Sequence, residues 1–384
     1  MPVTDDTLTA RRTVVLSATG ITLIAVCYGL ARFAYGLFVP AFRVAFDLDG
    51  AVVGAIAATS YAAYAVGILY ATVATPRLGA QFVATSAGVL GAIGCGLIAA
   101  APDPGILALG VAVAGSSTGV ASPPLAHVVA RRVREARRDR VQTVVNAGTG
   151  LGVLVSGPVA LFADEQWRLA WAVFAGMCAA AAVWAAVVVP SERTTRPRTQ
   201  RRRPRLVAGA TSLALAAAVS GSGTGPVWTF GQDLLRDVGG QSAGSAAIVW
   251  IVLGACGLVG AFAGGVIGRV GIVAAWRALV AAASVATAVL ALAPSSFAAA
   301  ALASGIFGAV YIAVTGVLLV WSTRVFVDSP ATGVGVAFLA LAIGQALGSP
   351  LIGWIADLTD LRVAIVVAAG LGLVALLVTP PRES

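Results

Sequence analysis

The stretch SERTTRPRTQRRRPR, residues 191–205, lies at the middle of the 384-residue chain and is its longest polar segment. Long apolar runs flank it on both sides, and 59% of the chain is hydrophobic whereas 11% is charged. Soluble domains carry about 25% charged residues, and a soluble globule of this size could not bury so much apolar surface. The sequence therefore predicts an all-α membrane protein of two parts, residues 1–190 and 206–384, joined by a basic linker over residues 191–205.

Each part divides into runs long enough to cross a bilayer. A transmembrane helix needs about 20 apolar residues to span about 30 Å of hydrocarbon. The run after Arg11 and Arg12 is longer than the core of a secretory signal, so we interpret it as the first span. Breaks between the runs predict twelve helices, at residues 13–40, 50–74, 79–101, 105–130, 141–163, 167–190, 206–230, 242–267, 272–293, 296–323, 331–355 and 362–380.

The placement of charge predicts the orientation. Cytoplasmic loops of membrane proteins are enriched in arginine and lysine, and this chain contains arginine only. With both termini inside, the inner loops collect 20 of the 25 arginines, while the outer loops collect four together with nine acids. We therefore expect a multi-pass protein of a bacterial inner membrane with both termini and the linker in the cytoplasm. The net charge of +9 follows from this bias, and no basic domain interleaved with aromatic residues indicates nucleic-acid binding.

An internal repeat relates the two parts. Shifting the sequence by 192 residues superposes loop and mid-helix breaks, and two halves in parallel register are one repeat arrangement of rocking transporters. The superposed pairs are Arg77-Leu78-Gly79 with Arg269-Val270-Gly271, Gly152 with Gly344, and Pro158 with Pro350.

With these features the chain resembles the major facilitator superfamily. That family has twelve helices in two pseudo-symmetric six-helix bundles and a signature, G-x-x-x-D-R-x-G, in the loop after the second helix. Here Arg77 and Gly79 retain part of it, and Arg269 and Gly271 retain it in the second half, where Gly268 replaces the acid. The resemblance implies that these two loops act as conformational switches.

Four further segments resemble the YbfB/YjiJ-type branch of the superfamily. The resemblance covers nearly the whole chain and implies transport by alternating access, but it names no solute. The segments are GLARFAYGLFVP (residues 29–40), SPPLAHVVARRV (122–133), Asn146-Ala147-Gly148 and VWTFGQDLL (227–235).

Arg32 is the sharpest single candidate for a site residue because it lies within the first apolar run. A guanidinium deep in a bilayer is expensive and usually faces a cavity or a partner. There it could bind an anionic group of a substrate through two parallel hydrogen bonds. The alternative is that Arg32, twenty residues after Arg12 and therefore about 30 Å further along a helix, extends to the outer headgroups.

Aromatic and amide side chains complete the predicted site. In the family the cavity is lined mainly by the first, fourth, seventh and tenth helices, which implies roles for residues on these helices. Each of these side chains could instead pack between helices or belong to an interfacial aromatic belt. The predicted substrate-binding residues are Tyr28, Arg32, Tyr35, Tyr61, Asn146, Trp228, Tyr311 and Gln345.

Two titratable residues are candidates for proton coupling. His127, the single histidine, follows Pro123 and Pro124 late in the fourth helix, and its pKa range suits a proton relay. Asp233 lies at the outer end of the seventh helix. The alternative interpretations are that His127 is an ordinary residue near the cytoplasmic end and that Asp233 is a solvated residue at a helix end.

Enzyme motifs are not found. The sequence contains no P-loop, no HExxH and no GxSxG on a strand, and its four cysteines are scattered singly. We therefore expect no enzymatic activity, no cofactor and no metal. The predicted function is secondary transport of a small solute, either a small organic anion or a hydrophobic, drug-like compound, by a monomer in contact with the lipid bilayer. The alternatives are a facilitative channel and an intramembrane lipid-handling protein.

Overall fold

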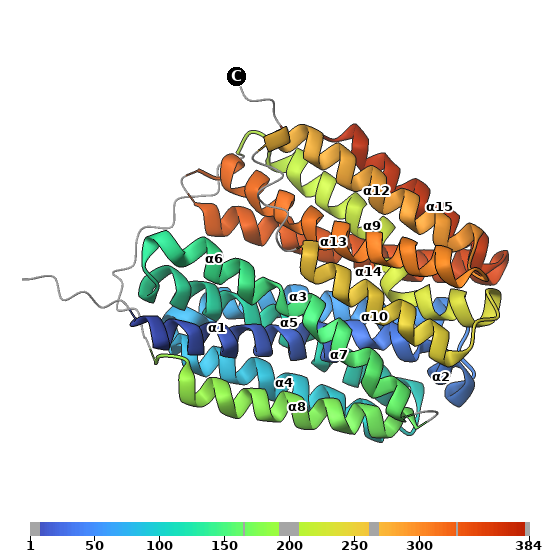
Figure 1. The fold of residues 1–384 in the computed structure, drawn as a ribbon, viewed down its shortest axis with the longest axis horizontal. Helices are drawn as coiled ribbons and strands as arrows, with labels where there is room; N and C mark the ends of the chain where they lie inside the picture. Colours follow the sequence, from blue (N-terminus) through green and yellow to red (C-terminus); the bar gives the residue numbers. More distant parts are fainter. Residues whose placement is uncertain (1–7, 164–165, 192–206, 261–268, 328, 381–384) are drawn as a thin grey trace, which may run out of the picture.

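The computed structural model describes residues 8–163, 166–191, 207–260, 269–327 and 329–380, and every element in these ranges is a helix. The helices lie side by side along the long axis of the molecule (Figure 1). The N-terminal set comprises α1 (Ala10–Ile24), η1 (Ala25–Phe33), α2 (Ala34–Phe46), α3 (Gly50–Leu78), α4 (Ala80–Ala100), α5 (Pro104–Arg132), α6 (Glu135–Asn146), α7 (Gly148–Ala163) and α8 (Trp167–Val188). The C-terminal set comprises α9 (Ala210–Asp233), η2 (Leu234–Val238), α10 (Ala243–Gly260), α12 (Ile272–Leu292), α13 (Phe297–Val325), α14 (Pro330–Leu358), α15 (Leu361–Val374) and η3 (Ala375–Leu377).

Ten helices of the described chain are long and apolar enough to cross a bilayer, so the protein is a multi-pass membrane protein. The first of them joins α1, η1 and α2 into one helix over Ala10–Phe46, longer than the predicted span at residues 13–40. Two predicted spans are not among the ten. Helix α9 has 24 residues, but Ser220–Thr224 lower its hydropathy, and the helix at Leu361–Leu377 is shorter. The predicted linker, apart from Ser191, and Gly268 of the loop signature lie outside the described residues.

Charge separates the two ends of the helices. At one end, aspartate side chains accept hydrogen bonds from backbone N–H groups in the first turns of α3, α5 and α15. A negative charge there also interacts favourably with the helix dipole. This aspartate-rich end holds Asp47, Asp49, Asp103, Asp233, Asp237, Asp357 and Asp360. The opposite, arginine-rich end holds Arg77, Arg131, Arg132, Arg134, Arg137, Arg138, Arg269 and Arg324.

Glycines set the closest helix crossings within each set. A Cβ added to Gly152 of α7 would overlap the carbonyl group of Ala25 in η1. A Cβ added to Gly344 of α14 would likewise overlap the carbonyl group of Ala218 in α9. Small residues let helix backbones approach in a membrane. Gly152 and Gly344 are 192 residues apart, so this type of crossing recurs at the offset of the sequence repeat.

The two predicted switch loops also share a backbone conformation at this offset. Gly79, between α3 and α4, has φ 95° and ψ 148°, and Gly271, before α12, has φ 81° and ψ 154°. Both values of φ lie where residues with a Cβ are disfavoured, which explains the glycine at each position. Arg77 and Arg269 are exposed at the arginine-rich end.

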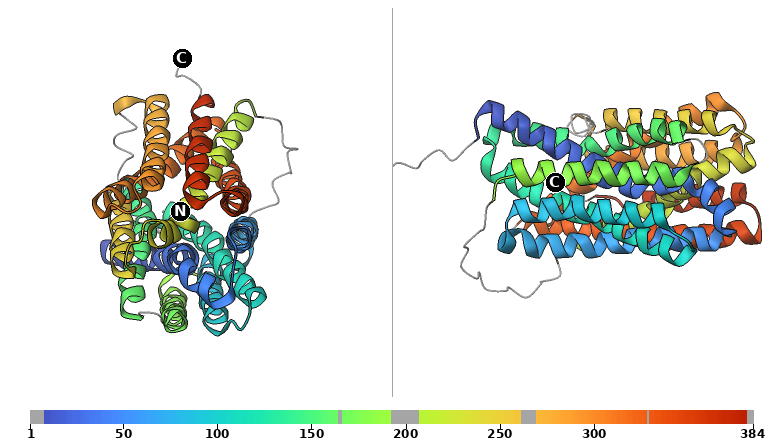
Figure 2. Two further views of the ribbon diagram at one scale, coloured as in Figure 1. Left: turned by 90° about the vertical axis from the view of Figure 1, so that its right-hand side faces the viewer. Right: turned by 90° about the horizontal axis from the view of Figure 1, so that it is seen from below.

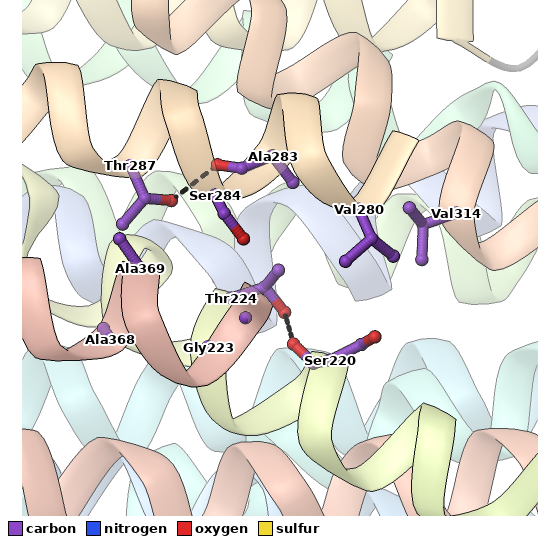
Figure 3. Close-up of a pocket in the computed structure, with 11 residues that line it drawn as sticks. Ser220, Gly223, Thr224, Val280, Ala283, Ser284, Thr287, Val314, Ala368 and Ala369 are labelled. Carbon is purple, nitrogen blue, oxygen red and sulfur yellow. Dashed lines mark hydrogen bonds between the residues drawn. The ribbon is translucent and has the colours of Figure 1, made fainter. Parts of the chain in front are cut away.

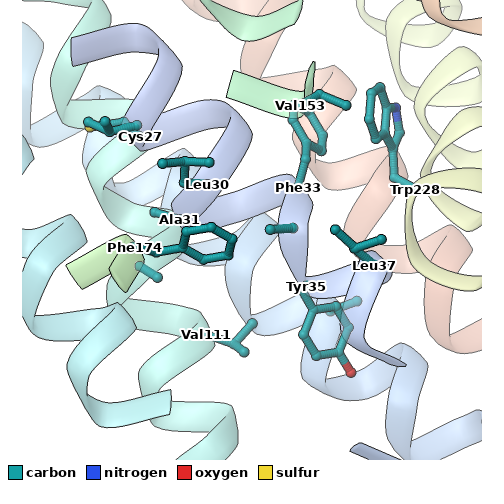
Figure 4. Close-up of a cluster of buried hydrophobic side chains, with 14 of the residues drawn as sticks. Cys27, Leu30, Ala31, Phe33, Tyr35, Leu37, Val111, Val153, Phe174 and Trp228 are labelled. Atoms are coloured by element: carbon teal, nitrogen blue, oxygen red, sulfur yellow. The ribbon is translucent and has the colours of Figure 1, made fainter. Parts of the chain in front are cut away.

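Among the described helices, the main contacts between the two sets are those of α3 with α14, α7 with α10, and α2 with α9. Two further views of the molecule show the sets stacked along their length (Figure 2). One buried apolar cluster runs through this junction, from Phe174 of α8 through Leu30 and Phe33 of η1 to Trp228 of α9 (Figure 4). The core is therefore continuous between the sets.

We predict that Gly152→Ala destabilises the protein by about 1–3 kcal/mol, because the new methyl group must force η1 and α7 apart. The matched control is Gly176→Ala on α8, where glycine is exposed and a Cβ would meet nothing within 4 Å. The measurement is the thermal unfolding midpoint of both purified variants in detergent. An equal midpoint for Gly152→Ala and the wild type would contradict the close crossing.

Candidate functional site

The first long helix changes its winding at the centre of the molecule. Residues Ala25–Phe33 form a π-helix, in which the N–H of Ala34 reaches the carbonyl of Gly29, five residues earlier. Such segments are rare and occur frequently at functional sites. The segment carries Tyr28 and Arg32 and is buried along most of its length.

Arg32 lies between the two helix sets. Its side chain donates a 2.7 Å hydrogen bond from Nη2 to Oε1 of Gln345 on α14, and the residue is 5% exposed. The interpretation that Arg32 extends to the outer headgroups is therefore wrong, because the guanidinium is held by a partner 313 residues away within the protein. Within the described part of the chain, no Asp or Glu forms an ion pair with it.

Aromatic rings surround the guanidinium instead of carboxylates. Its central carbon lies 4.2 Å from the ring centroid of Tyr64 and 5.0 Å from those of Tyr61 and Phe33. A cation over an aromatic face is stabilised by the ring quadrupole, by about 2 kcal/mol or more when water is excluded. These contacts stabilise a buried positive charge while leaving most of its N–H donors available.

The C-terminal set supplies the opposite wall. Gln345 donates from Nε2 to the Tyr311 hydroxyl at 3.1 Å, and Trp228 lies edge-on to Tyr311 with centroids 5.2 Å apart. Phe33 stacks on Trp228 across the junction at 4.1 Å. Gly36 makes this approach possible, because a Cβ there would overlap the carbonyl oxygen of Trp228.

A cavity of about 10 Å³ lies at this junction, with room for about one water molecule. Its lining combines residues of η1, α2 and α3 with residues of α9. The lining residues are Arg32, Phe33, Tyr35, Gly36, Ala57, Ser60, Tyr61, Trp228 and Thr229.

Most of the residues predicted to bind substrate come together here. Tyr28 faces the edge of Tyr64 and shares a 2.9 Å hydrogen bond with Ser122 of α5. Tyr35 lines the cavity, but its hydroxyl donates to the carbonyl of Val53. The predicted residues of the cluster are Tyr28, Arg32, Tyr35, Tyr61, Trp228, Tyr311 and Gln345.

Asn146 does not join this cluster. It is exposed at the end of α6 and accepts a hydrogen bond from Gln142 in the same helix. Conversely, the predicted set of binding residues lacks Ser60, which lines the cavity. The available signal was its helical spacing, since Ser60 precedes Tyr61 and lies four residues before Tyr64.

Of the two proton-coupling candidates, His127 is half-buried on α5, five residues after Ser122 and towards the arginine-rich end. Asp233 is fully buried, so the interpretation as a solvated helix-end residue is wrong. Its Oδ2 pairs with Nη1 of Arg43 from α2 at 2.5 Å. A role for either residue in proton coupling stays a prediction.

A second link joins the sets at the same aspartate-rich end. The carboxylate of Asp357, near the end of α14, accepts 2.7 Å hydrogen bonds from the N–H groups of Gly50 and Ala51, in the first turn of α3. Together with the Arg43–Asp233 ion pair, it links the two sets at this end of the molecule.

A second cavity, also of about 10 Å³, lies inside the C-terminal set between α9, α12, α13 and α15 (Figure 3). Hydroxyl groups line it, and two of them bond to their own helices: Thr224 to the carbonyl of Ser220 at 2.7 Å, and Thr287 to the carbonyl of Ala283 at 2.9 Å. All of its lining residues belong to the C-terminal set, so this cavity does not lie at the junction of the sets.

The sequence over residues 24–379 matches the family described as "Uncharacterised MFS-type transporter YbfB". The chain belongs to this family. It is therefore a major facilitator transporter, and the resemblance predicted from its motifs is confirmed. No curated protein matches the sequence.

Solved structures of other transporters share the fold. The crystal structure of the nucleoside transporter NupG has a TM-score of 0.75 at 14% identity, covering 95% of this chain and 97% of that one. A bacterial homologue of the human lysosomal transporter Spinster, in an inward-facing and unoccupied conformation, has a TM-score of 0.75 at 17% identity, and the match covers 96% of each chain. The human organic anion transporter MFSD10 (TETRAN) has a TM-score of 0.70 at 15% identity, covering 96% of this chain and 99% of that one.

We predict unequal effects of breaking the Arg43–Asp233 pair in this major facilitator transporter. Arg43→Gln leaves a fully buried carboxylate without its counter-charge and lowers the unfolding free energy by about 1–3 kcal/mol. Asp233→Asn has a smaller effect, because the Arg43 side chain is 32% exposed and can reach water.

Thermal unfolding of the purified variants measures this difference. The control is Arg362→Gln at the same end, where arginine is exposed, and we expect no change there. A larger loss for Asp233→Asn than for Arg43→Gln would contradict the assignment of the buried partner.

Proposed function

We propose that the protein is a secondary active transporter that works by alternating access, with twelve helices in two six-helix bundles. The bundles are residues 1–190 and 206–384, and residues 191–205 connect them. The glycine crossings and the turns at Gly79 and Gly271, which recur at an offset of 192 residues, support equivalent halves. In this proposal α9 and α15 are the seventh and twelfth spans.

The central cluster carries the proposal, because its contacts come from both helix sets. Arg32 bonds to Gln345, and Phe33 stacks on Trp228, so a rocking motion that separates the sets would take the site apart on one side. Substrate binding between the sets would thereby be linked to the motion.

The contacts indicate which side is closed. Arg43–Asp233 and the Asp357 hydrogen bonds join the sets at the aspartate-rich end. Within the described chain both of these polar links lie at the aspartate-rich end, which favours access from the arginine-rich end. With both termini in the cytoplasm of a bacterium, as the arginine bias favours, this is a state that opens inward. The similar Spinster homologue was solved in an inward-facing conformation.

The solute we favour is a small organic anion, because a buried guanidinium surrounded by rings has a charge without a carboxylate partner in the described chain. One similar structure is that of an organic anion transporter. A hydrophobic compound is the second candidate, supported by the aromatic wall of Phe33, Trp228 and Tyr311. Uptake and efflux are both compatible with this site.

Proton coupling would act through Asp233 in this scheme. Opening the aspartate-rich end breaks the Arg43–Asp233 pair, and a proton on Asp233 would weaken it.

We further propose that the protein functions as a monomer in the inner membrane and has no enzymatic activity. A facilitative channel would need a continuous pore, whereas links between the sets close one end here.

We predict that wild-type protein in proteoliposomes catalyses counterflow of a labelled solute from a panel of organic anions and neutral hydrophobic compounds. Arg32→Gln reduces the flux of the anion at least about tenfold, because a hydrogen-bonded charge is lost. Arg32→Lys retains more flux than Arg32→Gln, since it keeps the charge but not the planar fork.

The matched control is Arg134→Gln, an exposed arginine after α5, for which we expect unchanged flux. Absence of counterflow for every solute tested would refute the carrier proposal. Anion flux that does not depend on Arg32 would refute its role in substrate binding.

A further inference from the structure

Within the described chain, the guanidinium of Arg32 has a single hydrogen-bond acceptor, the side-chain amide of Gln345. The two residues are 5% and 0% exposed, so bulk water does not reach the contact. The bond is 2.7 Å long, within the range of charge-assisted hydrogen bonds. Aromatic rings surround the guanidinium, and its Nε is buried without a partner. A buried cation is therefore paired with a neutral group that accepts only part of its hydrogen-bonding capacity.

The amide of Gln345 is held in this position by its own helix set. Arginine can only donate hydrogen bonds, so the amide oxygen faces Arg32 and the amide NH₂ group donates to the Tyr311 hydroxyl at 3.1 Å. Helices α9 and α14 pack closely at this point, since a Cβ added to Gly225 would lie 3.1 Å from the Cα of Gln345. The backbone of Gln345 is thus fixed in the C-terminal set, and its side chain reaches across the junction.

This conformation has no room for a solute beside Arg32. The cavity that Arg32 lines measures about 10 Å³, enough for about one water molecule. An organic anion that binds the guanidinium must therefore displace part of the protein, and the group already bonded there is the Gln345 amide. An amide and a carboxylate share a planar shape, and the carboxylate has a second oxygen where the amide has its NH₂ group.

We propose that the Gln345 amide is an internal substitute for the carboxylate of the substrate. Its oxygen takes the place of a carboxylate oxygen on Arg32 and keeps the site self-occupied until an organic anion displaces it. The exchange favours the anion, because a carboxylate carries a charge and has two oxygens for the fork of N–H groups, whereas the amide offers one. This inference rests on the carrier function proposed above and adds a residue that regulates access to its site.

Displacement of the Gln345 side chain also changes the junction. The bond between Arg32 and Gln345 joins η1 to α14, so its loss removes one link between the two sets. A ligand shifts an equilibrium towards the conformation that it binds better. An anionic solute therefore favours conformations in which Gln345 has left Arg32, and the self-occupied form is the resting state without solute.

Removal of the internal substitute leaves a space of known shape. Gln345→Ala deletes the atoms of one acetamide molecule, so acetate and acetamide are probes that fit the vacated space. We expect acetate to bind this variant at least about tenfold more tightly than acetamide does, because only acetate supplies a counter-charge to Arg32. We also expect acetate to bind the wild type at least about tenfold more weakly than the variant, because Gln345 competes with it. Isothermal titration calorimetry of the purified full-length proteins, in chloride buffer of constant ionic strength, measures these affinities.

The matched control is Gln232→Ala. It deletes the same atoms at a buried position where the amide donates to the backbone carbonyl of Ala246. We expect acetate to bind this variant no better than it binds the wild type. Size-exclusion profiles of both alanine variants report on folding.

Gln345→Glu tests the inference without an added ligand and keeps the size of the side chain. The introduced carboxylate is a tethered copy of the anion, so we expect a higher thermal unfolding midpoint than that of the wild type. Counterflow of organic anions falls at least about tenfold, because the tethered group competes with the solute for Arg32. In an Arg32→Gln background the same substitution lowers the midpoint, since the carboxylate is then buried without a counter-charge. Gln232→Glu lowers it for the same reason.

The outcomes separate this inference from the carrier proposal. Acetate binding to Gln345→Ala that is no tighter than acetamide binding, or no tighter than acetate binding to the wild type, would overturn the inference. A lower midpoint or unchanged anion counterflow for Gln345→Glu would also overturn it, and counterflow by the wild type would then leave the carrier proposal standing. Tight acetate binding to Gln345→Ala without counterflow of any solute by the wild type would support the anion subsite and refute the carrier.

Discussion

A positive charge between two groups of helices is the constraint on which the rest of the structure depends. The Arg32 guanidinium is too deep in an apolar protein to be solvated by lipid or bulk water, so the protein supplies its solvation. Gln345 provides an acceptor, and the rings of Tyr64, Tyr61 and Phe33 provide polarisable faces. These groups come from helices on both sides of the junction. The rings belong to the N-terminal set and the acceptor to the C-terminal set, so the charge is stabilised at the place where the two sets meet.

The backbone packing serves this junction. At Gly36 the chain of α2 touches the carbonyl oxygen of Trp228, and at Gly152 α7 touches η1, so side chains larger than glycine would push the rings out of contact. The π-helical winding of Ala25–Phe33 occurs in the same segment that carries Arg32. The glycines let the helix backbones approach closely, and the π-helical segment carries Arg32 at the same place. Aromatic and charged side chains therefore meet directly at the junction.

Much of this could be predicted from the sequence, because it depends on composition and local pattern. Apolar runs predicted the helices, and the 192-residue offset predicted that Gly152 and Gly344 occupy similar positions. The cluster around Arg32 was expected from the resemblance to the family, whose cavity is lined mainly by the first, fourth, seventh and tenth helices. The pairing of Arg43 with Asp233, 190 residues apart, could not, because an ion pair across a junction leaves no local pattern. Asn146 was predicted from a segment that resembles the family, but it lies at the exposed end of α6 and does not join the cluster.

The trans-capping of α3 by Asp357 has a consequence for hydration. Asp49 binds the N–H of Val52 within its own turn, but the N–H groups of Gly50 and Ala51 depend on a carboxylate from α14. In the proposed alternating-access cycle the two sets part at that end, and both donors and the carboxylate would then need new partners, which water would supply. In that proposed cycle the entry of solvent would be thermodynamically part of the opening step, so dehydrating osmolytes would favour the state closed on that side.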